Sequence, residues 1–135
     1  YIMKLAFIGT GKIIADALFA IEPIKEIEKT AIFARPHSKE KAEAFAKQYN
    51  IAEVYTDYEK LLTETTADTV YIGLINSAHY SYAKQALLHG KNVILEKPFT
   101  GFYNEAQELQ QIAEENKLFI FEDCNGFFTM KYFTK

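Results

Sequence analysis

Three consecutive residues at the end of one apolar run could carry proton-transfer chemistry. Glu96, Lys97 and Pro98 interrupt the stretch VILEKPFT at residues 93–100. A lysine with a neighbouring acid and hydrophobic walls can donate to a substrate hydroxyl or carbonyl oxygen, and its pKa can fall enough for it to join proton transfer. Glu96 would orient this lysine or bond to the backbone, and Pro98, without an N–H, would help to stop strand pairing. The alternative is a solvated lysine at a strand end.

A second stretch, GTGKII at residues 9–14, has the composition of a phosphate-binding loop. Gly9 permits a tight turn, Gly11 lets the backbone approach a diphosphate, and the start of the following helix supplies N–H groups and a partial positive charge. We therefore expect a dinucleotide to bind here, although two glycines in such a turn can also be purely structural. Ile14 replaces the third glycine of the usual pattern, which predicts slightly wider packing between helix and strand. The residues assigned to the loop are Gly9, Thr10, Gly11, Lys12 and Ile13.

The stretch FARPHS bears on the choice between NAD and NADP. An acid about 20 residues beyond the glycines would hold the ribose 2′-hydroxyl of NAD, whereas an arginine accommodates the 2′-phosphate of NADP. Arg35 stands at this position, and no acid follows until Glu40. Pro36 restricts Arg35 to extended conformations, which would aim it along the rim of the sheet. The sequence favours NADP, with NAD and a solvated Arg35 as the alternative.

Polar residues also follow the run DTVYIGL, in the stretch GLINSAHY at residues 73–80. Gly73 would leave room for a flat ring against the backbone. Asn76 and His79 could form hydrogen bonds with a ribose or a substrate. Alternatively, Asn76 is a turn or cap residue and His79 lies in the first turn of a helix.

Short apolar runs alternate with amphipathic stretches along the chain. Runs that are almost continuously apolar are typical of strands covered on both faces, which predicts a parallel sheet. The predicted fold class is α/β, a doubly wound Rossmann-type sheet of order 3-2-1-4-5-6, with ligands at the carboxyl ends of its strands. Ser38 is an expected N-cap and Gly90 an expected C-terminal glycine. The predicted strands are 3–9, 30–35, 53–56, 68–74, 92–96 and 118–122, and the predicted helices are 13–21, 39–48, 58–64, 77 or 78 to 90, and 102–116.

Composition narrows the classes of protein. With 135 residues, 49% of them hydrophobic, the chain can bury the core of one globular domain. A net charge of −3 gives no electrostatic reason to expect nucleic acid, and no apolar stretch is long enough to predict a membrane span. The single cysteine, Cys124, excludes an internal disulfide and is typical of a reducing compartment, so we expect a cytoplasmic protein. We assign no metal site.

Four stretches together resemble the Gfo/Idh/MocA oxidoreductases, the relatives of glucose–fructose oxidoreductase and inositol dehydrogenase. The E-K-P match, one helix after N-x-x-H, is more specific than the glycine loop. The resemblance implies that Lys97 is the active-site lysine beside the nicotinamide and the substrate, and that Glu96 and Pro98 complete its motif. It also places Gly9, Gly11, Arg35, Asn76 and His79 on the cofactor and its surroundings. The stretches are LAFIGTGKII, AIFARPHSKEKAEAFA, NSAHYSYAKQALLHGKNVILEKPF and NEAQELQQIAEENKLF.

The resemblance also implies a second α+β domain, which we expect to lie outside this chain. We expect residues 1–122 to form the dinucleotide-binding domain and residues 123–135 to begin the linker to the missing substrate domain. The implied activity is hydride transfer between the nicotinamide and a sugar- or polyol-type substrate, with this chain inactive alone and the whole protein a homo-oligomer. The stretch GLIN departs from the family pattern of a small residue, Thr, Pro and Asn. A non-catalytic NAD(P)H sensor or regulatory module is the alternative function.

Overall fold

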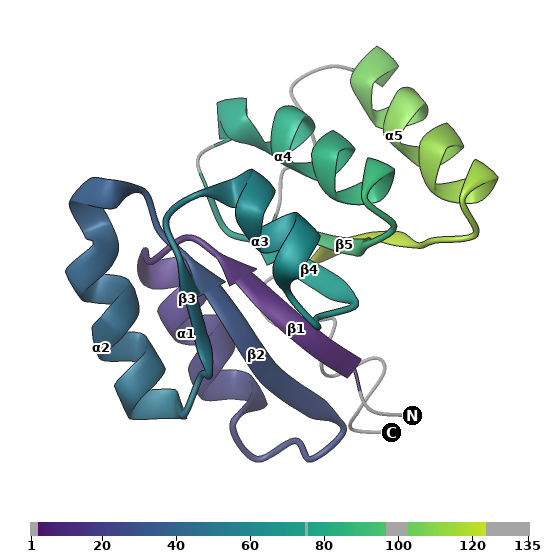
Figure 1. Cartoon of the computed structure of the whole chain (residues 1–135). Helices are drawn as coiled ribbons and strands as arrows, with labels where there is room; N and C mark the ends of the chain where they lie inside the picture. Colours follow the sequence, from purple (N-terminus) through teal and green to yellow (C-terminus); the bar gives the residue numbers. More distant parts are fainter. Residues whose placement is uncertain (1–2, 75, 97–102, 124–135) are drawn as a thin grey trace.

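The computed structural model describes residues 3–74, 76–96 and 103–123, which form one parallel sheet with helices on both faces (Figure 1). The strands follow the order β3-β2-β1-β4-β5-β6, and every neighbouring pair is parallel. This confirms the predicted doubly wound, Rossmann-type order. The strands are β1 (Met3–Ile8), β2 (Ile27–Phe33), β3 (Glu53–Tyr55), β4 (Thr69–Ile72), β5 (Asn92–Glu96) and β6 (Ile120–Asp123).

The helices divide between the two faces of the sheet (Figure 1). One face is covered by the first two α-helices, and the other by the remaining three. A short 3₁₀ helix, η1, connects β2 to the second α-helix. The helices are α1 (Lys12–Ile21), η1 (Pro36–Ser38), α2 (Lys39–Tyr49), α3 (Tyr58–Glu64), α4 (Asn76–Leu88) and α5 (Tyr103–Glu115).

Strand β1 shows why the apolar runs are nearly continuous. Leu5 and Phe7 belong to the core beneath α1 and α2, whereas Ala6 and Ile8 belong to the core beneath α3, α4 and α5. All four residues are buried. Because successive side chains of a strand point to opposite faces, the part of a strand that lies between two helical layers is almost continuously apolar.

Most of the predicted bounds differ from the observed ones by one to three residues, and two strands show the reason. Strand β2 begins at Ile27 rather than at residue 30, because residues 27–29 pair with β1 although Glu28 is exposed and Lys29 only half-buried. Strand β6 covers Ile120–Asp123 rather than residues 118–122. The bounds of both strands depend on which residues pair with the neighbouring strand, and a run of apolar residues in the sequence does not show this pairing.

The helix caps agree only in part with those predicted from the sequence. The Asp57 carboxylate accepts a hydrogen bond from the Lys60 N–H at 3.2 Å, at the start of α3. Gly90 follows α4 with a φ of 78°, as a C-terminal glycine should. Ser38 precedes α2, but its side chain forms no capping bond, because η1 already leads the chain into that helix.

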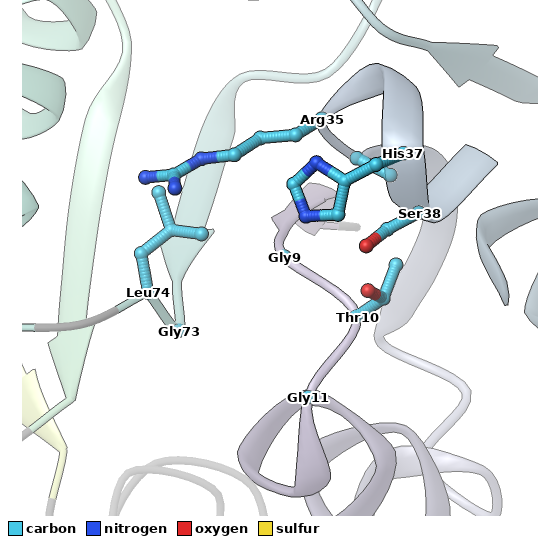
Figure 2. A pocket seen from close by; sticks show the side chains of 9 residues that line it. Gly9, Thr10, Gly11, Arg35, His37, Ser38, Gly73 and Leu74 are labelled. Atoms are coloured by element: carbon cyan, nitrogen blue, oxygen red, sulfur yellow. The ribbon is translucent and has the colours of Figure 1, made fainter.

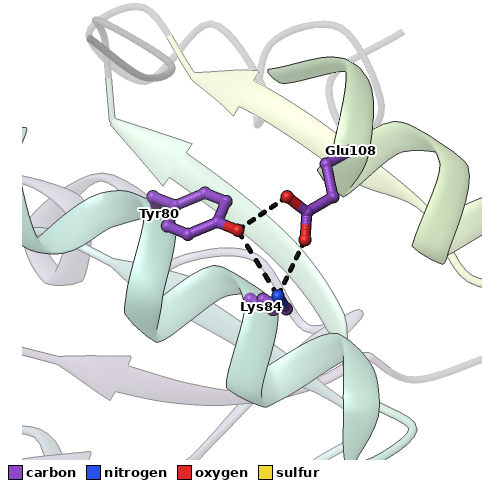
Figure 3. Close-up of polar contacts among 3 residues, drawn as sticks. All are labelled: Tyr80, Lys84 and Glu108. Atoms are coloured by element: carbon purple, nitrogen blue, oxygen red, sulfur yellow. Dashed lines mark hydrogen bonds and ion pairs between the residues drawn. The ribbon is translucent and has the colours of Figure 1, made fainter. Parts of the chain in front are cut away.

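A polar cluster of Tyr80, Lys84 and Glu108 ties α4 to α5 (Figure 3). The Tyr80 hydroxyl donates to Glu108 Oε1 at 2.7 Å, and Lys84 Nζ lies 2.8 Å from Glu108 Oε2. The hydrogen bond from Lys84, followed by that from Tyr80, holds the pKa of Glu108 below its usual range. A carboxyl with a lowered folded-state pKa contributes stability above its unfolded pKa and loses it as the pH falls through the lowered value. The cluster therefore fixes α4 against α5 at neutral pH.

Candidate functional site

A pocket lies at the carboxyl ends of β1, β2 and β4, where the strand order reverses direction (Figure 2). Open α/β sheets bind their ligands at this switch point. The three segments that line the pocket come from separate parts of the chain and meet because β1 pairs with both β2 and β4. The lining residues are Gly9, Thr10, Gly11, Ala34, Arg35, His37, Ser38, Gly73 and Leu74.

Gly9 is required by the fold itself. Its φ is 123°, a left-handed conformation that residues with a side chain rarely adopt. A Cβ on Gly9 would lie 3.0 Å from the Gly73 carbonyl oxygen and 3.2 Å from Leu74 Cδ2. Its N–H donates to the Phe33 carbonyl at 2.9 Å, which joins the loop to the end of β2. The purely structural interpretation is therefore sufficient for Gly9.

Gly11 is different, because nothing in the protein requires a glycine there. Its φ of −79° and ψ of −173° are extended backbone angles open to any residue. A Cβ on Gly11 would meet no protein atom within 4 Å. Gly11 is also the N-cap of α1, and no side chain caps this helix. The first turn of α1 thus presents backbone N–H groups beside open space, which suits an anionic ligand.

Replacing Gly11 with serine should separate ligand binding from folding. Serine is a favourable N-cap, so we expect the free energy of unfolding to change by no more than about 0.5 kcal/mol. The new side chain would occupy space that the ligand needs. The affinity for the dinucleotide should therefore fall roughly 10-fold or more, because overpacking typically costs about 1–3 kcal/mol. Urea denaturation and calorimetric titration measure the two effects.

Gly9→Ala is the contrasting variant. It should destabilise the fold by about 1–3 kcal/mol, because it forces a side chain into a left-handed conformation. Equal loss of stability in both variants would contradict the ligand role that we assign to Gly11.

The space at Gly73 is already filled by the protein. A Cβ on Gly73 would lie 2.7 Å from Ile14 Cδ1 and 2.9 Å from Ile14 Cγ1. Ile14 is completely buried, so it occupies the volume that a side chain at residue 73 would need. We expected Ile14 to hold the helix slightly farther from the strand, but the absence of a side chain at Gly73 also makes room for Ile14. The same contact means that a flat ring would not lie on the Cβ side of Gly73, although its backbone does line the pocket.

The turn after β2 brings polar side chains to the pocket. Arg35 is extended, with φ −64° and ψ 155°, as Pro36 predicts, and its side chain reaches across the pocket towards Leu74 (Figure 2). The Ser38 N–H donates to the Arg35 carbonyl at 2.8 Å, which closes η1 and sets His37 and Ser38 facing the glycine loop. The sequence alone did not identify His37 or Ser38 as pocket residues. The available signal was Pro36, which starts the turn.

His79 lies behind the pocket wall rather than in its lining. The side chain is completely buried, and Nε2 lies 2.9 Å from the Leu74 carbonyl oxygen. A carbonyl oxygen only accepts hydrogen bonds, so Nε2 carries a hydrogen and donates it. His79 thereby supports Leu74, which lines the pocket. Its direct contact with a cofactor or substrate stays a prediction.

The other predicted residues lie around the same edge or outside the described ranges. Lys12 and Ile13 occupy the first turn of α1, exposed and outside the pocket lining, and Lys12 Nζ lies 4.0 Å from Asp16 Oδ2. Asn76 begins α4, and Glu96 ends β5 at the carboxyl edge. The structure does not describe Lys97 and Pro98, and their roles stay predictions.

The part of the chain that the structure describes contains neither a helix suited to a membrane nor a cluster of metal ligands. No helix within residues 3–74, 76–96 and 103–123 combines the length and apolarity needed to cross a membrane. Within the same ranges, no three or more His, Cys, Asp or Glu side chains are grouped so that they could hold a metal ion.

Comparison with known sequences gives a consistent result. The family described as "Oxidoreductase family, NAD-binding Rossmann fold" (GFO_IDH_MocA) matches residues 3–123. A trans-1,2-dihydrobenzene-1,2-diol dehydrogenase of Xenopus tropicalis is 29% identical over 119 residues, which cover 88% of this chain and 36% of the relative. The scyllo-inositol 2-dehydrogenase (NADP(+)) IolU of Bacillus subtilis is 32% identical over 120 residues, 89% of this chain and 36% of the relative. The chain thus spans about a third of the length of these relatives.

Solved structures agree on the fold. KijD10, a 3-ketoreductase from Actinomadura kijaniata solved with TDP-benzene and NADP, superposes with a TM-score of 0.83 and 31% identity, over 90% of this chain and 38% of that one. A scyllo-inositol dehydrogenase from Lactobacillus casei, solved with NAD(H) and scyllo-inositol, gives a TM-score of 0.79 at 21% identity, over 90% and 36% of the two chains. The second comparison, at this identity, supports the fold alone.

Proposed function

Because this chain belongs to the Gfo/Idh/MocA oxidoreductase family, we propose that it forms the NADP-binding part of an enzyme that transfers a hydride between the nicotinamide and a sugar- or polyol-type substrate. The observation that carries the proposal is the pocket, which combines open space at Gly11 with a cationic turn after β2. Two relatives, named as dehydrogenases of a cyclic diol and of scyllo-inositol, support the substrate class.

The start of α1 is the proposed binding site for the diphosphate. The backbone N–H groups after Gly11 have no side-chain cap, and α1 carries no acidic residue in its first turn. The partial positive charge of a helix N-terminus and these donors together favour an anion. Gly11 leaves the room for its close approach.

The turn after β2 is the proposed binding site for the 2′-phosphate of NADP. Arg35 can form paired, charge-assisted hydrogen bonds with phosphate oxygens, and Ser38 adds a hydroxyl. The described residues that line the pocket include no Asp or Glu, the kind of residue that would hold the 2′-hydroxyl of NAD. This composition supports a preference for NADP.

We assign the reacting end of the site to the last residue of β5 and to the residues that follow this strand. When bound, the nicotinamide supplies the carbon, C4, that exchanges the hydride. We assign to Lys97 a hydrogen bond to the reacting substrate oxygen and the transfer of its proton, with Glu96 orienting the lysine or bonding to the nicotinamide ribose. Residues 1–122 are the proposed cofactor domain, and residues 123–135 lead to a second domain that supplies the remaining substrate contacts.

Arg35→Ala tests the cofactor assignment. Removing the guanidinium should lower the affinity for NADP roughly 10- to 100-fold, because a hydrogen bond to a charged group contributes about 1.5–3 kcal/mol. Affinity for NAD, which lacks the 2′-phosphate, should change less than about twofold on the same reasoning. Calorimetric titration of both nucleotides into wild type and variant measures this difference.

Lys39→Ala is the matched control, since Lys39 is an exposed cation next to η1 that does not line the pocket. It should leave the ratio of the two affinities unchanged. A wild-type protein that prefers NAD, or an Arg35 variant that loses both nucleotides equally, would contradict the assignment.

A further inference from the structure

We propose that His37 makes the preference for NADP over NAD depend on pH, by taking up a proton when a 2′-phosphate binds beside it. This inference rests on the proposed function and extends it to the regulation of the same site. It assigns to His37 a role in cofactor selectivity, separate from the fixed charge of Arg35.

The position of His37 is the first support. It is the middle residue of η1 and lines the pocket together with Arg35 and Ser38. Its ring lies between the Arg35 side chain and Thr10, directed towards the glycine loop (Figure 2). The chain has three histidines, and the other two, His79 and His89, lie elsewhere: one is buried against the Leu74 carbonyl, and the other is exposed at the end of α4.

The charges around His37 are the second support. The pocket lining supplies the Arg35 guanidinium and neutral groups from the β1–α1 loop and from the turn after β4. Beyond the lining, the neighbouring elements carry Lys39 and Glu40 at the start of α2, and Lys12 at the start of α1 with its partner Asp16. No carboxylate stands among the described residues of the lining. An anion that contacts His37 within this pocket would therefore have to come from the ligand.

Proton linkage follows from these two observations. An imidazole changes its charge between about pH 5 and 8, and a phosphate ester of about −1.5 to −2 charge favours the protonated form. NADP binding should therefore take up part of a proton near neutral pH. NAD carries a neutral hydroxyl at this position and should take up none. The affinity for NADP should rise as the pH falls from about 8 to 6.5, and level off near about pH 6, where the phosphate itself gains a proton.

The experiment measures proton uptake directly. NADP and NAD are titrated calorimetrically into the protein at pH 7 in two phosphate-free buffers of different ionisation enthalpy. We expect NADP binding to take up roughly 0.3–0.7 proton and NAD binding less than about 0.1. The ratio of NAD to NADP dissociation constants should be roughly 3- to 10-fold larger at pH 6.5 than at pH 8, up to the tenfold that one pKa unit represents.

Two glutamine variants separate His37 from other sources of proton uptake. His37→Gln keeps a hydrogen-bonding side chain that does not titrate, so it should abolish the uptake and flatten the pH dependence of the ratio. His89→Gln, at an exposed histidine whose Nδ1 bonds with the Gln85 carbonyl at 2.8 Å, should change neither.

The outcomes distinguish this inference from the function on which it rests. Preferential NADP binding without proton uptake, or with uptake that persists in His37→Gln, would overturn the role of His37 alone. Wild-type protein that binds neither nucleotide would overturn the proposed function as well.

Discussion

Replacing Lys97 with alanine in the complete enzyme should lower kcat by roughly 10²- to 10⁴-fold, the contribution typical of a positioned proton donor or acceptor. The affinity for NADP should change less than about threefold, because the proposed diphosphate and 2′-phosphate contacts lie at α1 and at the turn after β2. Steady-state turnover of a polyol or sugar substrate and calorimetric titration of NADP measure the two quantities. A large fall in kcat with intact cofactor binding is the result expected of a catalytic lysine.

The same variant separates the enzyme from its alternative. A non-catalytic sensor of NAD(P)H would use the pocket at Gly11 and Arg35 but would need no proton-transfer group at residue 97. It would retain its nucleotide response in Lys97→Ala and show no turnover in the wild type. Lys60→Ala, at an exposed lysine of α3, is the control for loss of a surface charge and should leave kcat unchanged.

Replacing Gly73 with alanine should lower the free energy of unfolding by about 1–3 kcal/mol, the usual cost of inserting a methyl group into a packed core. The added Cβ would lie 2.7 Å from Ile14 Cδ1, and Ile14 is completely buried. To relieve this contact, either α1 must move away from the end of β4 or the Ile14 side chain must change its conformation. Because Gly73 and the loop before Ile14 both line the pocket, dinucleotide affinity should fall with stability.

A double-mutant cycle tests whether this contact causes the loss. Ile14→Ala alone should cost about 2–5 kcal/mol, mainly for the cavity that it leaves. In the Gly73→Ala, Ile14→Ala double variant the new methyl group enters that cavity, so the combined cost should be about 1–2 kcal/mol less than the sum. Urea denaturation of the four proteins gives the coupling.

Gly73→Ala combined with Ile21→Ala is the matched control. Ile21 is also buried in α1 but lies at the other end of the helix, so the two costs should add. If the costs of Gly73→Ala and Ile14→Ala were also additive, the contact with Ile14 would not be the reason why a side chain at residue 73 destabilises the fold.

Local patterns in the sequence were sufficient for the architecture. Nearly continuous apolar runs such as residues 5–8 indicated strands covered on both faces, and their alternation with helical stretches left the doubly wound order as the expected topology. The same patterns predicted that Gly9, Gly11, Arg35 and Gly73 would lie close together, because a parallel sheet brings the carboxyl ends of its strands to one edge. All four residues line the pocket. Pro36 also predicted the extended conformation of Arg35 correctly. These features depend on backbone preferences and periodicity, which each segment carries by itself.

Contacts between segments were decided only by the tertiary structure. The sequence did not show that Gly73 makes room for Ile14, that His79 supports the Leu74 carbonyl from behind the pocket, or that η1 turns His37 and Ser38 towards the glycine loop. Residue type and spacing indicate which face of an element is buried, but not which side chain from another element meets it. That pairing depends on how helices and strands pack together, and it determines which polar groups line the pocket and which are enclosed behind it.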